Sequence, residues 1–360
     1  MMTADSSANS SSAPARTLSA SALRDRLARG RFLRAMAVLA LVTIAASVAA
    51  LAVGRFPIGA EKLFAALSPW DDAGRMIENV VWNVRAPRVV LALLAGAGLA
   101  MAGAAFQALF SNPLAAPDTL GVATGASFGA VLGILLGAGA LLVQSLALVF
   151  GLAAVALVML IARRRDGGTP ILMIVLSGIV VGSFFTALVS LVKFVADPQD
   201  VLPAVTFWLM GSLTGASFST LAAGFPMAAL GAAVLLLLRW RLNAAALPED
   251  EAKSLGIPVG RIRAAVILGA TMLTASVVSM CGLIGWVGLL VPHAVRMAAG
   301  AADNRRVLPA SALAGALFML LVDTSARTMT AGEVPVSILT ALVGAPFFIH
   351  LLRRTGGLTG

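Results

Sequence analysis

The chain has 360 residues, of which 59% are hydrophobic and 12% charged, and its mean hydropathy is +0.97. Apolar runs of about 20 residues, long enough to span a hydrocarbon core of about 30 Å, recur along it and exclude a soluble fold. Cys281 is the only cysteine and the two histidines are far apart in sequence, so the composition excludes an intrachain disulfide and we expect no metal site.

The N-terminal segment, residues 1–35, is rich in Ser, Ala and Arg and has no apolar period, which predicts a disordered tail. Basic residues followed by an apolar run would also describe a cleaved signal peptide. The run at 36–54 is long for a signal peptide, and many apolar segments follow it. We therefore interpret 36–54 as a membrane span that stays in the protein.

The apolar runs predict an all-α polytopic membrane protein with about ten transmembrane helices. Lipid accepts only helices or closed barrels as spanning elements, and these runs are too long and continuous for barrel strands. They form a membrane domain at 36–354, followed by a short tail at 355–360. The predicted spans are 36–54, 89–110, 118–137, 140–162, 170–195, 219–238, 262–281, 284–299, 307–327 and 335–352.

An even number of spans places both termini on one side of the membrane. With the N-terminus inside, 19 of the 26 Lys and Arg residues lie on the inner face, which agrees with the positive-inside rule. We therefore expect both termini in the cytoplasm. The net charge of +10 then reflects topology and anionic lipid, and gives no reason to expect nucleic acid as a partner.

Glycines recur at nearly one per helical turn in the predicted third span, at 121, 125, 129, 133 and 137. In a bilayer this spacing forms a smooth groove that another helix backbone can approach closely. Asp118, just before this groove, can accept hydrogen bonds from the first turn as the N-cap of the third span.

The inner loop at 240–262 contains a short polar segment between long apolar runs. Pro248 suits a first helical position, three acids follow it at Glu249–Glu251, and Gly256 suits a C-cap. A solvated connector would explain the polarity of this segment, but not the presence of helix-start and helix-end signals at its two ends. The segment therefore predicts a rigid helix that docks an inner-face partner.

Three arginines mark span ends on the outer face. Arg85 and Arg88 begin the second span and Arg327 ends the ninth. They could reach along the membrane surface toward water, or bind carboxylates through their planar guanidinium groups. Asp323 precedes Arg327 by four residues, a spacing that predicts an ion pair. An unpaired acid inside a span would instead indicate proton or sodium coupling.

Five blocks of the sequence, in order, resemble the membrane permeases of ABC importers for iron-siderophores, haem and cobalamin, the FecCD type. The resemblance extends over roughly residues 36–354, and the family more often has a small residue where Asp118 stands. The blocks are 85–126, 207–217, 249–257 ("EDEAKSLGI"), 282–297 ("GLIGWVGLLVPHAVRM") and 321–354.

The resemblance implies a type II importer in the bacterial inner membrane, with two permease copies in a homodimeric twenty-helix core. Two cytoplasmic ABC ATPases bind inside and a periplasmic or extracellular substrate-binding protein docks outside. Glutamates of that binding protein would pair with Arg85, Arg88 and Arg327. The residues implied to couple to the ATPase are Glu249, Asp250, Glu251, Ala252, Lys253, Ser254, Leu255 and Gly256.

The sequence contains no G-x-x-x-x-G-K-[ST] phosphate loop, so we expect a transport subunit that is not itself an enzyme. It would carry no cofactor, with ATP and Mg²⁺ held by the partner ATPase. Ferric siderophore is the first choice of cargo, with haem or cobalamin as alternatives. The competing interpretation is a secondary transporter that uses an ion gradient and acts without an ATPase.

Overall fold

The computed structural model describes residues 13–54, 56–68, 70, 73–163, 170–245, 249–254, 256–299, 303–329 and 332–354. All regular structure in these ranges is helical. The chain divides into two compact units, residues 1–42 and 43–360, and each is described by itself. The predicted tail at 355–360 lies outside the described residues.

The first unit contains the N-terminal part of helix α1 (Ala13–Ala52). We predicted disorder up to residue 35. Residues 1–12 lie outside the described part of the chain, but for 13–35 the structure has helix instead. The helix begins with Pro14 in its first turn, and Ala, Leu and Arg, which favour helix, continue to Arg34 with no further proline.

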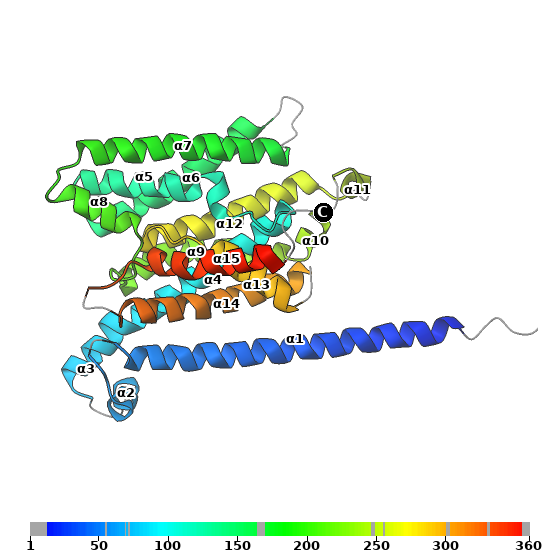
Figure 1. The fold of residues 1–360 in the computed structure, drawn as a ribbon, viewed down its shortest axis with the longest axis horizontal. Coiled ribbons are helices and arrows are strands. Elements are labelled where there is room, and N and C mark those ends of the chain that lie inside the picture. The colour runs from blue at the N-terminus through cyan, green and yellow to red at the C-terminus, as the bar shows by residue number, and fades with distance from the viewer. Residues whose placement is uncertain are drawn as a thin grey trace, which may run out of the picture. The chain divides into compact units, whose positions relative to one another are not determined.

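The second unit is a bundle of helices whose order follows the predicted spans (Figure 1). A π-helical segment, η1, joins α3 directly to α4, and a 3₁₀ turn, η2, precedes α5. The elements after α1 are α2 (Ala60–Leu67), α3 (Arg75–Asn79), η1 (Val80–Arg85), α4 (Ala86–Leu109), η2 (Pro117–Leu120), α5 (Val122–Leu135), α6 (Ala140–Ala162), α7 (Ile171–Val195), α8 (Val201–Leu209), α9 (Phe218–Leu238), α10 (Arg241–Ala245), α11 (Glu249–Ser254), α12 (Val259–Cys281), α13 (Val287–Ala299), α14 (Asn304–Ala326) and α15 (Val336–Arg354).

Every one of the ten predicted spans contains a helix, but the count of ten transmembrane helices is not confirmed. Within the described residues, seven helices are long and apolar enough to cross a membrane: Arg29–Ala52, Arg75–Leu109, α6, α7, α9, α12 and α14. Three apolar helices are shorter, at Val122–Leu135, Val287–Ala299 and Val336–Ile349. Pro and Gly residues lie near the start of the predicted third and eighth spans, so the helices there begin later in the chain than predicted and are shorter.

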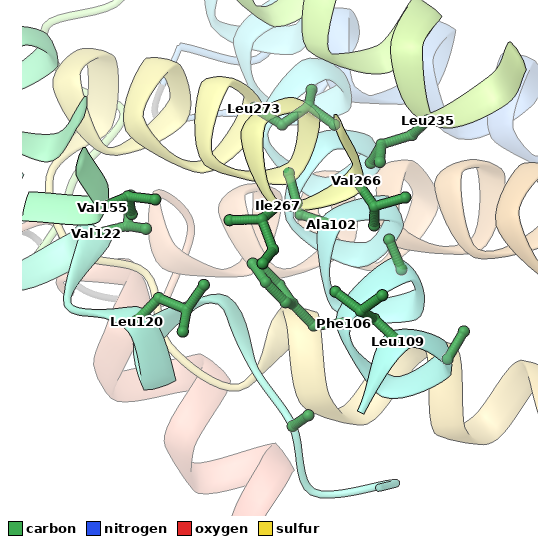
Figure 2. Packing of buried hydrophobic residues seen from close by; sticks show 14 of the residues in the cluster. Ala102, Phe106, Leu109, Leu120, Val122, Val155, Leu235, Val266, Ile267 and Leu273 are labelled. Carbon is green, nitrogen blue, oxygen red and sulfur yellow. The ribbon is translucent and has the colours of Figure 1, made fainter. Parts of the chain in front are cut away.

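The centre of the bundle is built on α4 and α12. In their most apolar stretches, 78% and 83% of the residues are buried. Figure 2 shows Phe106 of α4 among side chains from α12 and the turn before α5, including Ile267 and Leu120. On another side of α4, backbone meets backbone: a Cβ added at Gly96 would lie 2.0 Å from the carbonyl oxygen of Gly315 on α14. The two helices that carry the outer charges are thereby packed directly together.

The glycine groove is confirmed as a packing surface. Gly125, Gly129 and Gly133 of α5 face α6, and a Cβ at Gly129 would lie 2.2 Å from the carbonyl oxygen of Leu146. Gly121 lies against α7, while Gly137 has open space beside it. These contacts fix α5 to α6 more closely than larger side chains would allow.

Candidate functional site

The three predicted arginines come together in one charged cluster, which we call the arginine cluster: Arg85, Arg88 and Arg327 with Asp323 and Glu333. The π-helical segment ends at Arg85, and Arg88 lies in the first turn of α4. Arg88 Nη2 lies 2.9 Å from Asp323 Oδ1, and Arg88 Nε donates to both carboxylate oxygens at 3.0 and 3.1 Å. Its Nη1 lies 2.9 Å from Glu333 Oε2, in the loop after α14.

Arg85 and Arg327 bind the C-terminal end of α1. Arg85 Nη1 donates to the carbonyl oxygens of Leu51 at 2.6 Å and Ala52 at 2.8 Å, and its Nη2 donates to Phe56. Arg327 Nη2 donates to the carbonyl oxygen of Ala50. The last carbonyl groups of a helix have no partner within it, so these cations satisfy them and complement the negative end of the helix dipole.

The cluster is therefore enclosed. Only 5% of Arg85, 7% of Arg88 and 6% of Arg327 is exposed, which does not fit arginines that extend along the surface toward water. The predicted Asp323–Arg327 pair is present at 4.0 Å, but the closer partner of Asp323 is Arg88. Local spacing indicated the weaker pair, because the stronger one joins residues 235 positions apart.

The predicted coupling segment contains the helix α11, which covers Glu249–Ser254. The backbone N–H of Ile257 donates to the carbonyl oxygen of Ala252 at 3.0 Å, and Gly256 is left-handed at φ +70°. This is the hydrogen bond with which a Schellman motif ends a helix. Ala252 is buried and Glu251 exposed. Leu255 and the side chains of Glu249, Asp250 and Lys253 lie outside the described part of the chain.

A polar network beside this segment was not predicted. Asn243 of α10 donates to Asp303 Oδ1 at 2.6 Å and accepts from Asn304 Nδ2 at 2.8 Å. Arg296 at the end of α13 donates to Asn304 Oδ1 and to the carbonyl oxygen of Ala104 on α4, both at 3.0 Å. Asn243 of α10 is thus bonded directly to the start of α14, and through Asn304 and Arg296 it is linked to α13 and α4. Isolated Asn residues carry no periodic signal that could have predicted it.

Asp303 holds this network in its charged form. Burial by itself would raise the pKa of the Asp303 carboxyl, but hydrogen bonds from the backbone N–H of Arg305 and from Asn243 outweigh it and hold the pKa below the usual range. Asp303 is also the N-cap of α14.

A groove of about 520 Å³ follows α7. One face of α7, with glycines, Ile179, Ala187 and three hydroxyl side chains, forms its wall, and Asp118 and Thr119 of η2 lie at one end. The lining residues are Asp118, Thr119, Gly178, Ile179, Gly182, Ser183, Thr186, Ala187 and Ser190.

Asp118 does not cap the third span as we predicted. The chain first forms the 3₁₀ turn Pro117–Leu120, so α5 begins at Val122 with Gly121 as its N-cap. The Asp118 side chain is exposed on the single chain, where it borders this groove.

The FecCD transport family model matches residues 40–354. The chain belongs to the FecCD transport family. This FecCD chain is 38% identical over 314 residues to the molybdate import system permease MolB of Haemophilus influenzae, covering 85% of the chain and 92% of the relative. It is 37% identical to an iron chelatin transport permease of Helicobacter pylori (85% and 96%) and 42% identical to the cobalamin import permease BtuC of Halobacterium salinarum (76% and 73%).

A solved structure of a metal-chelate type ABC transporter, in an inward-facing conformation, is similar to it throughout. The TM-score is 0.81 at 37% identity, covering 89% of this chain and 99% of that one. This FecCD chain is a membrane permease of the ABC importer kind, and a transport component, as its sequence predicted.

No group of three or more His, Cys, Asp or Glu residues is placed to hold a metal ion among the residues that the structure describes. The absence of a resident metal site in this FecCD chain stays a prediction, since some residues are not described.

Proposed function

We propose that this permease carries an iron chelate across a bacterial inner membrane, with ferric siderophore as the first choice and haem or cobalamin as alternatives. Its likeness to a solved metal-chelate type ABC transporter, which extends over 99% of that chain, carries the proposal. The relatives named for iron chelatin and cobalamin support the same class of cargo. Both termini lie in the cytoplasm in this proposal, in agreement with the distribution of Lys and Arg.

The working importer contains two copies of this chain, two cytoplasmic ATPase subunits and an outer substrate-binding protein. ATP and Mg²⁺ belong to the ATPase, since this sequence has no phosphate loop. Residues 249–256 contact the ATPase. The termination of α11 and the bonded network beside it support this role, because a connector that moves freely could not transmit force.

Reconstitution in liposomes tests the proposal against a transporter driven by an ion gradient. With ATPase and binding protein present, we expect chelate uptake that stops when ATP is withdrawn. Uptake by the permease alone, driven by a proton or sodium gradient, would establish the competing function.

Replacing Glu249, Asp250 and Glu251 with Lys tests the coupling segment. We expect the ATPase to be lost from the purified complex while the permease still inserts in the membrane. The matched control replaces the exposed Glu61 and the partly exposed Glu78, two acids far from α11 in the chain, with Lys. Equal ATPase retention in both variants would show that α11 is not the contact.

The arginine cluster forms the docking site for carboxylates of the binding protein. Because Arg85 and Arg327 are occupied by α1, the contact that an incoming carboxylate can replace is Arg88–Glu333. The Glu333 side chain is 24% exposed, whereas that of Asp323 is 1% exposed. In the free permease, the Glu333 carboxylate thus occupies the site on Arg88. On docking, a carboxylate of the binding protein takes its place.

Glu333→Gln tests this exchange without removing a buried charge. We expect the binding protein to dock several-fold more tightly, measured by surface-immobilised permease at two salt concentrations, because a competing anion is weakened. Glu78→Gln serves as the control. Unchanged affinity for Glu333→Gln would place docking elsewhere on the outer face.

A further inference from the structure

We propose that Asp118 selects cargo by charge: its carboxylate disfavours anionic chelates in the permeation path and favours neutral or cationic ones. This inference rests on the proposed transport function and specifies the class of chelate. It is carried by the position of the carboxylate in the groove beside α7.

Two hydroxyl groups of the groove wall already donate to backbone carbonyl oxygens, so they need no fixed acceptor from a passing ligand. Thr186 Oγ1 donates to the carbonyl oxygen of Gly182 at 2.8 Å, and Ser190 Oγ donates to that of Thr186 at 3.0 Å. Their lone pairs remain directed away from the helix backbone, so these two positions are polar without holding a donor that needs a fixed partner. Such a wall gives weak, repeated contacts.

The carboxylate is held at the end of this wall by the packing of η2 on α7. A Cβ added at Gly178 would lie 2.2 Å from the carbonyl oxygen of Thr119, so turn and helix touch through backbone. Thr119 Oγ1 also donates to the carbonyl oxygen of Ala116 at 2.7 Å and tightens the turn. Asp118 therefore cannot withdraw from the groove by a movement of the turn alone.

Asp118 borders a second cavity as well, of about 230 Å³, between η2 and the segment around Trp286. Among the described residues that line either cavity, it is the only charged one. Lys193 lies on the same side of α7, but 11 residues beyond Gly182, or about 16 Å along the helix. The negative charge of Asp118 therefore sets the sign of the local electrostatic potential. A second permease copy would place a second such charge on the same path.

An ionisable group in a low-dielectric passage acts over a long distance. At an effective dielectric constant of about 20, two unit charges about 10 Å apart change an equilibrium on the order of tenfold. An anionic chelate would be repelled in this way where its path passes Asp118.

Charged thiol reagents measure the potential directly. Ser183→Cys places a thiol in the groove, while the native Cys281 is buried. At pH 7.5 we expect a cationic methanethiosulfonate to react with this thiol faster than an anionic one. Asp118→Asn should lower that ratio on the order of a hundredfold, because the two labelling rates each change about tenfold in opposite directions. Asp200→Asn, at an exposed acid beyond α7, should leave the ratio unchanged.

The ratio of the two labelling rates cancels any change in the ionisation of the thiol itself. If the ratio is the same with and without the Asp118→Asn substitution, the inference is overturned.

Uptake by the full importer then tests the cargo. With ATPase and binding protein kept constant, Asp118→Asn should raise transport of a trianionic ferric tris-catecholate relative to a neutral ferric tris-hydroxamate. If variant and parent transport the two chelates in the same ratio, Asp118 does not select the cargo. The same conclusion follows if neither protein transports the anionic chelate. Absence of ATP-dependent uptake in the parent protein would instead count against the proposed function, and the labelling ratio would still report on Asp118.

Discussion

At the scale of single residues, the charged groups of the arginine cluster have their partners within the protein, either carboxylates or backbone carbonyl oxygens. Arg88 lies between Asp323 and Glu333, and the 2.9 Å contact with Asp323 is almost fully enclosed. A buried ion pair adds little net stability compared with apolar side chains, but removal of one partner leaves an uncompensated charge. The residue types were predictable from sequence, but their pairing was not.

Asp323→Ala should destabilise the permease by about 3–5 kcal/mol, because Arg88 then remains buried with only the partly exposed Glu333. Thermal unfolding in detergent measures the loss, and Asp200→Ala, at an exposed acid, is the matched control. The double variant Arg88→Met with Asp323→Leu should lose less than either single change. A loss in the double variant equal to the sum of the two single losses would show that the pair is not energetically coupled.

At the scale of helices, close backbone packing fixes α5 against α6. The periodic glycines predicted that packing, because a repeat of one small residue per turn gives a bilayer helix a smooth face that a neighbouring backbone can approach. The partner helix was not predictable, since any neighbour could occupy such a groove. The same holds for Gly96 and Gly315, whose facing positions depend on how α4 and α14 cross.

Gly129→Ala should destabilise the α5–α6 contact by about 1–3 kcal/mol, because the added methyl group meets the carbonyl oxygen of Leu146 and forces the helices apart. Gly139→Ala is the control, as its Cβ would meet nothing within 4 Å. Unfolding of both variants in detergent gives the comparison. A loss at Gly129 no greater than at Gly139 would mean that α6 moves aside freely.

The network of Asn243 links α10, which precedes α11, to α4, α13 and α14, and we predict that it transmits the movement of the ATPase. Asn243→Ala should leave ATPase binding and hydrolysis in place while chelate transported per ATP falls several-fold. Asn83→Ala, an exposed Asn bonded to Asn79, is the control. Transport and hydrolysis that fall together would indicate a structural role only.

At the scale of the whole molecule, the groove face of α7 is open on the single chain, and only 28% of the apolar window of α7 is buried. A carboxylate at its end makes lipid an unfavourable neighbour for this face. We predict that a second copy of the chain covers this face and that the two grooves together enclose the path.

Thr186→Cys should therefore crosslink two permease copies in membranes with a flexible bis-maleimide, because Cys281 is buried and does not compete. Leu237→Cys, on an exposed position of α9, is the control and should crosslink little. Mass spectrometry of the crosslinked dimer identifies the pair. Crosslinking at Leu237 but not at Thr186 would place the dimer contact on another face.

Hydrophobic periodicity and length by themselves determined that this is a polytopic helical membrane protein, because lipid leaves the chain few alternatives. Sequence also determined the permease family and the short helix α11, through motifs that are continuous in the chain. The tertiary structure decided the Arg88–Asp323 pair, the binding of Arg85 and Arg327 to α1, the Asn243 network and the entry of Asp118 into the groove. Each joins segments far apart in sequence, and their contacts depend on how helices pack, which no local pattern specifies.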